Sequence, residues 1–272
     1  MIISDLVKNI RSKKSFLCIG LDPDLNLLPK HLLKKEDPIF EFNKAIIDTT
    51  INHCIAYKPN LAFYERLGPD GLKSLQKTVQ YIPEDIFIIA DAKRSDIFNS
   101  ANMYAETFYN HFNFDAVTLS PYMGVDSVKP FLRKNKWAIL LIATSNPSAS
   151  SVQNIKTYSG APLYSELVSQ AQDWGDENNI MFVVGATRLK EMASIRKKAP
   201  NHFFLVPGVG AQEGDMNAVC RNSFNANCGV LINVSRSIIY AGSGENFAHD
   251  VNRECCQIQK NMQSILEQYQ FI

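Results

Sequence analysis

Three charged residues follow a short apolar run in the first half of the chain. The run, residues 88–90, ends in Asp91, and Lys93 and Asp96 come two and five residues later. Residues two apart on an extended backbone point to the same side, so the Asp91 carboxylate and the Lys93 ammonium can face one another. In a poorly solvated place each charge needs the other. The pair therefore indicates either an active site or an ordinary ion pair that ends a strand.

Asp96 also has two interpretations. It could join the charges of such a site, or it could be a first-turn acid that a helix dipole favours. The second interpretation depends on the residues that follow with helical spacing, which are Ile97, Phe98, Ala101 and Tyr104.

Lys58 and Asp22 stand at the ends of two earlier apolar runs. Lys58, in YKPN, ends the run that precedes the run of Asp91. If these runs are neighbouring strands, Lys58 meets Asp91 and Lys93 in an alternating charge network, whereas a surface lysine would reach bulk water. Asp22, in GLDPDL, ends the first run, although an aspartate before proline is also a common turn residue.

Two later motifs could bind a phosphate. PGVGAQ contains Gly208, Gly210 and Gln212, and VSRS contains Arg236. The glycines would let backbone N–H groups approach an anion, and the Arg236 guanidinium has a fork suited to phosphate oxygens. The alternative is a tight turn and a surface arginine. The five histidines show no metal-ligand spacing and the six cysteines no C-x-x-C, so no metal site is predicted.

Eight short apolar runs are candidates for the strands that position these residues. Most lack polar alternation, as expected when both faces of a parallel sheet are covered. They are FLCIGL (16–21), CIAYKP (54–59), IFIIAD (86–91), DAVTLS (115–120), WAILLIA (137–143), IMFVVG (180–185), FFLVPG (203–208) and GVLINV (229–234).

Segments with helical spacing separate the runs. The first gap has Phe40, Ala45, Ile46 and Thr49, and the second has Leu72, Leu75 and Val79. The stripe in the tail after Asn246 is Val251, Cys255, Ile258, Met262, Ile265, Leu266 and Tyr269.

This alternation predicts an α/β fold with right-handed crossovers, and the count of eight favours a closed (β/α)8 TIM barrel over an open doubly wound sheet. In that fold the active site lies at the C-terminal ends of the strands, and the loops after strands 7 and 8 often hold a phosphate. No linker divides residues 1–272, so a single domain is predicted. The long polar loop at 145–160 is a candidate lid or a mobile surface excursion.

Composition narrows the class of protein. The chain has 272 residues, 46% hydrophobic and 20% charged, with a formal net charge of +1. This balance is typical of a globular protein and gives no broad basic field for nucleic acid. No stretch of about 18 apolar residues occurs, and charges interrupt the N-terminal apolar residues. The sequence therefore predicts a cytoplasmic protein that binds neither nucleic acid nor membrane.

The ordered set GLDPD, YKPN, DAKRSDI, TLSPYMG, PGVGAQ and VSRSI resembles the orotidine 5′-phosphate decarboxylase family, in particular its longer bacterial branch. The resemblance runs from the first predicted strand to the eighth. It implies a TIM barrel, a homodimer with sites at the subunit interface, and no metal or organic cofactor. The implied reaction converts orotidine 5′-phosphate to uridine 5′-phosphate and CO2 in pyrimidine nucleotide biosynthesis.

The resemblance also implies residue roles. The family's Lys-Asp-Lys-Asp catalytic array would be formed by Lys58, Asp91, Lys93 and Asp96. Asp96 would reach the site of the other subunit, and Ser100, a turn later, would offer a hydroxyl to the ribose there.

The substrate-binding roles follow in the same way. Asp22 would hold a ribose hydroxyl, and Gln212 and Arg236 the phosphate. Ser145 would contact the pyrimidine edge, although TSNPSAS offers other hydroxyls nearby. Ser235 precedes the arginine where many relatives have glycine, and it would contact the phosphate through its backbone amide.

This chemistry accounts for the charges. Loss of CO2 from the pyrimidine C6 leaves an sp2 carbanion with little resonance relief, so the site must stabilise charge that appears as the bond breaks. The Lys93 ammonium, held by Asp91 and Asp96, could stabilise that carbanion and then donate the proton. Asp91 would also crowd the substrate carboxylate.

Three alternatives remain. A sugar-phosphate decarboxylase or synthase of the same superfamily places magnesium over an enediolate, but it has an acidic ligand at the position of Lys58, where a cation would repel the metal. An aldolase would need a neutral Lys93, which flanking carboxylates oppose. A barrel without activity that only binds nucleotides or partners is the third.

Overall fold

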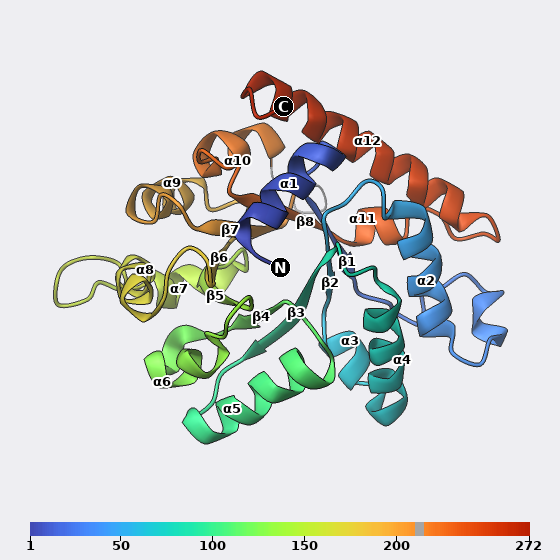
Figure 1. Ribbon diagram of the computed structural model, residues 1–272, viewed down its shortest axis with the longest axis horizontal. Helices are drawn as coiled ribbons and strands as arrows, with labels where there is room; N and C mark the ends of the chain where they lie inside the picture. The colour runs from blue at the N-terminus through green and yellow to red at the C-terminus, as the bar shows by residue number, and fades with distance from the viewer. Residues whose placement is uncertain (210–214) are drawn as a thin grey trace.

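Eight parallel strands form a closed barrel in the computed structural model, which describes residues 1–209 and 215–272. Each strand pairs with the next, and β8 pairs with β1 to complete the ring (Figure 1). The strands are β1 (Leu17–Leu21), β2 (Ala56–Pro59), β3 (Phe87–Arg94), β4 (Ala116–Leu119), β5 (Trp137–Ala143), β6 (Ile180–Val184), β7 (Phe203–Pro207) and β8 (Val230–Val234). The predicted (β/α)8 barrel and all eight of its strands are confirmed.

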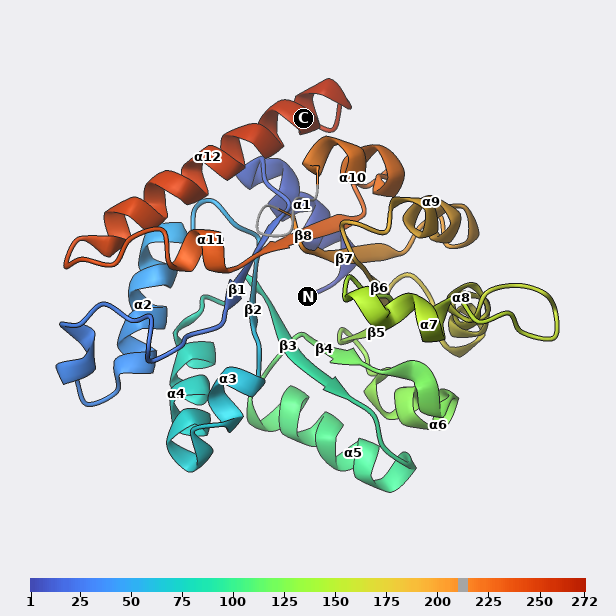
Figure 2. The same ribbon diagram turned by 180° about the vertical axis from the view of Figure 1, so that it is seen from behind.

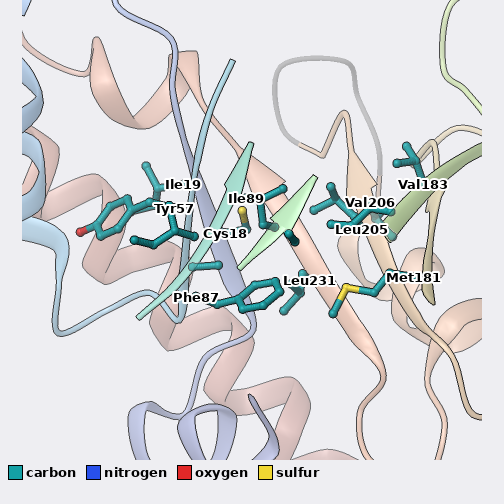
Figure 3. Close-up of a cluster of buried hydrophobic side chains, with 14 of the residues drawn as sticks. Cys18, Ile19, Tyr57, Phe87, Ile89, Met181, Val183, Leu205, Val206 and Leu231 are labelled. Carbon is teal, nitrogen blue, oxygen red and sulfur yellow. The ribbon is translucent and has the colours of Figure 1, made fainter. Parts of the chain in front are cut away.

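The strands lack polar alternation because both of their faces are covered. All five residues of β1, β6 and β8 are buried. Figure 3 shows side chains of β1, β2, β3, β6, β7 and β8 packed into one cluster, which includes Tyr57, Phe87 and Met181. A rigid apolar barrel of this kind gives the side chains at the strand ends a fixed frame.

Helices surround the barrel in both views (Figures 1 and 2). The longer ones are α1 (Ile3–Lys13), α2 (Pro38–Thr50), α4 (Gly68–Tyr81), α5 (Phe98–Glu106), α8 (Leu163–Trp174), α9 (Leu189–Lys198), α10 (Met216–Ser223) and α12 (Phe247–Gln268). Four short ones follow strand ends, namely α3 (Ala62–Glu65), α6 (Val125–Val128), α7 (Ser150–Gln153) and α11 (Arg236–Ile239). No helix of the described residues is long and apolar enough to cross a membrane.

The N-terminal helix α1 is an addition to the repeating strand and helix units. The N-terminal amine lies 3.2 Å from Asp115 Oδ1, and Trp137 Nε1 donates to the Met1 carbonyl over 2.9 Å. Asp115 and Trp137 are at the starts of β4 and β5, so this segment covers the N-terminal end of the barrel. Figure 1 shows α1 in front of the strands. The opposite end, seen in Figure 2, carries the loops that follow the strands.

The apolar residues with helical spacing are buried to different extents in α12 and α2. The α12 stripe is confirmed, except that Ile258 is only partly buried and Tyr269, just beyond the end of the helix, is exposed. The helix predicted in the first gap is confirmed as α2, although it buries Ile39, Phe42 and Ile47 along with Ile46, while Phe40, Ala45 and Thr49 are only partly buried. Since α2 packs against both α4 and α12, its contact surface is wider than a single stripe.

The first-turn interpretation of Asp96 is wrong. Helix α5 begins at Phe98, and Ile97 before it has an extended backbone, so Asp96 lies in the loop. Asp96 Oδ1 accepts from the Ile97 N–H over 2.7 Å. Ile97 and Phe98 are 64% and 55% exposed, whereas Ala101 of the same predicted stripe is fully buried, so the stripe does not form one buried face of the helix.

Candidate active site

Lys58, Asp91 and Lys93 form a continuous ionic chain at the mouth of the barrel. Lys58 Nζ donates to Asp91 Oδ2 over 2.6 Å, and Lys93 Nζ donates to Asp91 Oδ1 over 2.5 Å. Lys58 and Asp91 are only 5% and 8% exposed, whereas the Lys93 side chain is 51% exposed. The structure therefore brings these three predicted residues together, with one ammonium enclosed and the other free to approach a ligand.

A bulge in β3 places Lys93. The pairing of β3 with β4 shifts between Ala90 and Arg94, and Lys93 has a φ of 49°, in the left-handed region that a side chain rarely adopts. The expected extended backbone therefore does not continue through Lys93, although the ion pair with Asp91 forms. A backbone held in this region at a strand end is typical of a functional position.

Thr118, at the end of β4, holds this bulge. Its Oγ1 accepts from the N–H groups of Ala92 and Lys93 over 3.0 and 2.9 Å and donates to Asp91 Oδ1 over 3.1 Å. One hydroxyl thus orients both the carboxylate and the backbone of the lysine. The sequence reasoning missed Thr118, and its only signal was its place at the end of an apolar run.

The charges of the cluster reinforce one another. Burial alone would raise the pKa of Asp91, but the charges of Lys58 and Lys93 outweigh it and hold the pKa well below its usual range. Burial would lower the pKa of Lys58, but the carboxylates of Asp91 and Asp22 outweigh it and raise the pKa. Lys58 and Asp91 are therefore both ionised at neutral pH, as fixed charges near a reacting group require.

A cavity of about 680 Å³ opens beside this ionic chain. Lys58, Asp91, Lys93 and Thr118 line one wall, and the rest of the lining is mostly apolar, including Leu141 and Val183. Its volume is in the range of pockets that hold small organic ligands. A largely apolar cavity with a fixed charge cluster in its lining is suited to a flat ring whose charge changes during reaction.

Ser145 joins this cavity to a smaller one of about 160 Å³. Ser145 and Pro207 line both cavities, so the two spaces are adjacent. Close packing fixes Ser145, because a Cβ added at Gly185, just after β6, would lie 2.9 Å from Ser145 Cβ. Among the nearby hydroxyls, Thr144 is engaged by Gln153 and Asn146.

The smaller cavity collects the residues predicted to bind ribose and phosphate. Asp22, Gly208, Ser235 and Arg236 line it, from the ends of β1, β7 and β8. Arg236 is exposed at the start of α11. Gln212, and Gly210 with it, lie outside the described residues.

Asp22 is held by its neighbours. Its Oδ2 accepts from Ser235 Oγ over 2.7 Å, and its carbonyl accepts from Tyr240 Oη over 3.0 Å. Tyr240 Oη also accepts from the Asp24 N–H over 2.6 Å. Burial raises the pKa of Tyr240 to about 12, so its hydroxyl keeps its proton at neutral pH. The sequence reasoning also missed Tyr240, which lies 218 residues from Asp22 along the chain.

Asp96 and Ser100 are not part of this cluster within one chain. Asp96 hydrogen-bonds to the Ile97 amide, and neither residue lines the two cavities. Both lie in the loop and first turn after β3, beside the exposed Phe98. Within the described residues, no group of three or more His, Cys, Asp or Glu side chains is placed to hold a metal ion.

Comparison with known proteins gives a consistent result. Residues 15–251 match the model of the Orotidine 5′-phosphate decarboxylase / HUMPS family. Orotidine 5′-phosphate decarboxylase of Phocaeicola vulgatus is 51% identical over 96% of this chain and 97% of its own length, and that of Flavobacterium johnsoniae is 49% identical over 98% and 99%. The solved structure of Leishmania donovani OMP decarboxylase superposes with a TM-score of 0.80 at 35% identity, covering 96% of this chain and 100% of that one. The chain belongs to the orotidine 5′-phosphate decarboxylase family.

Proposed function

We propose that this chain decarboxylates orotidine 5′-phosphate at the ionic chain of Lys58, Asp91 and Lys93, with Lys93 as the proton donor. Family membership and curated relatives at about half identity assign the reaction, which yields uridine 5′-phosphate and CO2 in pyrimidine biosynthesis. The assignment of side chains to individual steps is our proposal. The observation that carries it is the 2.5 Å contact between Asp91 and a lysine that is half exposed to the cavity.

Lys93 acts on the carbanion. As CO2 leaves C6, the electron pair of the breaking bond stays on the ring carbon, and the Lys93 ammonium stabilises it electrostatically. The same ammonium then transfers a proton to C6. Because Thr118 and Asp91 fix the backbone and the head group of Lys93, the charge is in place before the reaction begins.

Asp91 and Lys58 set the polarity of the site. Asp91 carries a full negative charge beside the position of the substrate carboxylate, which favours departure of that group as neutral CO2. Lys58 keeps Asp91 ionised despite its burial. The order of charges, positive, negative, positive, therefore depends on all three residues.

The two adjacent cavities orient the substrate. The pyrimidine occupies the larger cavity, with its edge toward Ser145, and the ribose and phosphate extend into the smaller one. Asp22 accepts from a ribose hydroxyl, while Arg236, the Ser235 amide and Gln212 bind the phosphate. Residues 145–160 act as a lid, because Ser145, Val152 and Gln153 line the larger cavity from this segment. Contacts remote from C6 supply binding energy for closure and orientation.

A homodimer completes each site. Asp96 and Ser100 lie in the segment after β3, and the segments after β3 and β4 carry exposed apolar side chains, with exposed fractions from 48% to 81%: Ile97, Phe98, Met103, Tyr122 and Met123. Exposed apolar side chains of this kind favour burial against a second copy. In that dimer, Asp96 extends the ionic chain of the partner subunit beyond its lysine.

The cytoplasmic location and the single-domain organisation stay predictions.

The test of the proton donor is spectroscopic. Purified chain and orotidine 5′-phosphate are mixed, and the loss of orotate absorbance is followed for the wild type, Lys93→Ala and Lys73→Ala. Lys73 is the control because it pairs with Asp70 on the surface of α4 at 70% exposure. Loss of one fixed charge and of the general acid predicts a fall in kcat of about 10⁴-fold or more for Lys93→Ala. Unchanged turnover in that variant contradicts the assignment.

The shared site has its own test. Lys93→Ala and Asp96→Ala are each expected to be nearly inactive. If the sites are shared, a mixed dimer of the two variants contains one site with both residues intact. Equimolar mixing after subunit exchange should then restore about a quarter of the wild-type activity, because half of the dimers are mixed and each has one working site of two. No recovery despite exchange means that Asp96 does not act across the interface.

A further inference from the structure

We infer that the side chain of Ser235 is a positioning residue for Asp22, and that it sets how strongly the site discriminates for a ribose hydroxyl. The inference rests on the proposed function, in which Asp22 accepts from that hydroxyl. It differs from the backbone contact to phosphate that the resemblance implies for Ser235, because it concerns the hydroxyl that a glycine at this position would lack.

The two oxygens of the Asp22 carboxylate are in different states. Oδ2 accepts from Ser235 Oγ over 2.7 Å, whereas Oδ1 is buried and has no hydrogen-bond partner among residues 1–209 and 215–272. A buried acceptor without a donor costs free energy, so a hydroxyl that enters the adjacent cavity and donates to Oδ1 would remove that cost. Since Ser235 occupies one oxygen, the carboxylate presents the other in a single orientation.

The backbone of Asp22 is fixed separately. Tyr240 Oη donates to its carbonyl over 3.0 Å and accepts from the Asp24 amide over 2.6 Å, which ties the loop after β1 to the segment after α11. With the backbone held, the remaining freedom of Asp22 is rotation of its side chain. The bond from Ser235 removes that freedom, which lowers the entropic cost of ordering the carboxylate on a ligand.

Gly20 provides the space in which Ser235 reaches Asp22. A Cβ added at Gly20 would lie 2.6 Å from Ser235 Cβ, 2.9 Å from Ser235 Oγ and 3.1 Å from Asp22 Oδ2. Ser235 Oγ also lies 3.3 Å from the Gly20 carbonyl. A glycine on β1 and a serine after β8 therefore fit one another, and the contact links the first and last strands at the site.

The experiment compares substrates with and without the hydroxyl. kcat/KM is measured for orotidine 5′-phosphate and for its 2′-deoxy and 3′-deoxy analogues, with the wild type, Ser235→Ala and Asp22→Ala. For the wild type, we expect one deoxy analogue to be about tenfold or more poorer, because Asp22 Oδ1 then stays unpaired. Ser235→Ala should reduce that ratio at least about threefold, chiefly through KM, and Asp22→Ala should abolish it.

The outcomes separate this inference from the proposed function. If Asp22→Ala abolishes the discrimination and Ser235→Ala leaves it intact, the positioning role is overturned and the role of Asp22 stands. If the wild type treats all three substrates alike, or if Asp22→Ala leaves the discrimination unchanged, the proposed role of Asp22 fails and the inference fails with it. An equal loss on all substrates in Ser235→Ala means that the serine acts generally on the fold, which also overturns it.

A matched pair of variants separates packing from positioning. Gly20→Ala alone should lower the melting temperature and kcat/KM, because the added Cβ meets Ser235 Cβ. Gly20→Ala with Ser235→Gly should recover the melting temperature but keep the weakened discrimination, since the Oγ to Oδ2 bond is absent. Recovery of the discrimination along with the melting temperature contradicts the inference.

Discussion

Two largely enclosed cations lie at opposite ends of the barrel and have different hydrogen-bond partners. Lys58, at the C-terminal end of β2, donates to Asp91 and lines the large cavity. Arg196, near the end of α9, lies at the other end of the barrel, next to the starts of β7 and β8. Its guanidinium donates to the carbonyls of Ser223, Ala199, Pro200, His202 and Gly229.

The pKa values of the two cations are shifted in opposite directions. Burial lowers the pKa of Arg196 to about 10 against a smaller opposing effect of Cys228, and the group still stays charged at neutral pH. Burial acts in the same direction on Lys58, but Asp91 and Asp22 reverse it. Arg196 also stacks on the Phe204 ring at 3.8 Å from its centroid.

This difference indicates which cation does chemistry. All three nitrogens of Arg196 are used by backbone carbonyls, so the side chain connects loops and has little left to offer a ligand. An ammonium has three donors, and among the described residues Lys58 uses its donors only on Asp91. A site keeps its charges incompletely satisfied by the protein, whereas a structural contact satisfies its charge fully.

Of the effects that distinguish Lys58 from Arg196, the largest expected one is on catalysis at the mouth of the barrel. Lys58→Met keeps an unbranched side chain but removes the charge that holds Asp91 ionised, so kcat/KM should fall about 10³-fold or more. The free energy of unfolding should fall by only about 1–2 kcal/mol, because Asp91 keeps its bonds to Lys93 and Thr118. Orotate absorbance and urea unfolding measure the two quantities. A Lys58→Met variant that is active but strongly destabilised would mean that Lys58 has a structural role instead of a catalytic one.

Replacement of Arg196 by methionine at the other end of the barrel should mainly lower stability and leave catalysis nearly unchanged. Arg196→Met leaves five carbonyls without their donor, so the free energy of unfolding should fall by about 3 kcal/mol or more. The kcat of the folded variant should stay within about twofold of the wild type, since Arg196 lies far from the cavity lining. Arg196→Lys is the control, because it keeps the charge without the fork and should recover only part of the stability. A selective loss of kcat in folded Arg196→Met would contradict the structural role.

The pH dependence of stability sharpens the comparison further. The pKa of Asp91 is lowered in the folded state, so its contribution is present above the ordinary carboxyl pKa of roughly 3.9 and is lost as the pH falls through lower values. The pKa of Lys58 is raised, so its contribution is present below roughly 10.4 and is lost as the pH rises toward the folded value.

The difference in unfolding free energy between the wild type and Lys58→Met should therefore be flat from about pH 5 to 9. It should narrow below about pH 4, as Asp91 takes up its proton in the unfolded chain, and above about pH 10.4, as Lys58 loses its proton in the unfolded chain. Urea unfolding across this range measures it. A difference that changes steadily between pH 5 and 9 indicates that another titrating group is responsible.

The parts of the site that the sequence predicted depend on neighbours along the chain. Apolar runs predicted the strands, and the ends of those runs predicted Lys58, Asp91 and Lys93, because the closed barrel brings all C-terminal strand ends to one mouth. Helical spacing predicted α2, but it did not identify all the residues that α2 buries, because the helix packs against two neighbours.

Contacts between distant segments could not be predicted in the same way. Thr118 lies 27 residues from Asp91, and Ser235 lies 213 residues from Asp22. A hydroxyl at a strand end has no local pattern that distinguishes an orienting contact from a solvated one. Arg196 gives even less signal, because its acceptors are backbone carbonyls that any residue type carries.

The smallest expected effect is that of removing divalent metal. A magnesium ion at this mouth would need a carboxylate oxygen, but both oxygens of Asp91 already accept from ammonium groups, one of them the buried Lys58. To bind there, the ion would have to approach two cations and displace one, which Coulomb repulsion opposes. Dialysis against EDTA should therefore leave kcat/KM within about twofold of its starting value.

Added magnesium should likewise fail to restore the activity of Lys58→Met, because the fixed ammonium supplies a charge at one position and a mobile ion does not. Loss of activity in EDTA, or recovery of Lys58→Met by magnesium, would mean that a divalent ion supplies the charge that the proposed mechanism assigns to lysine.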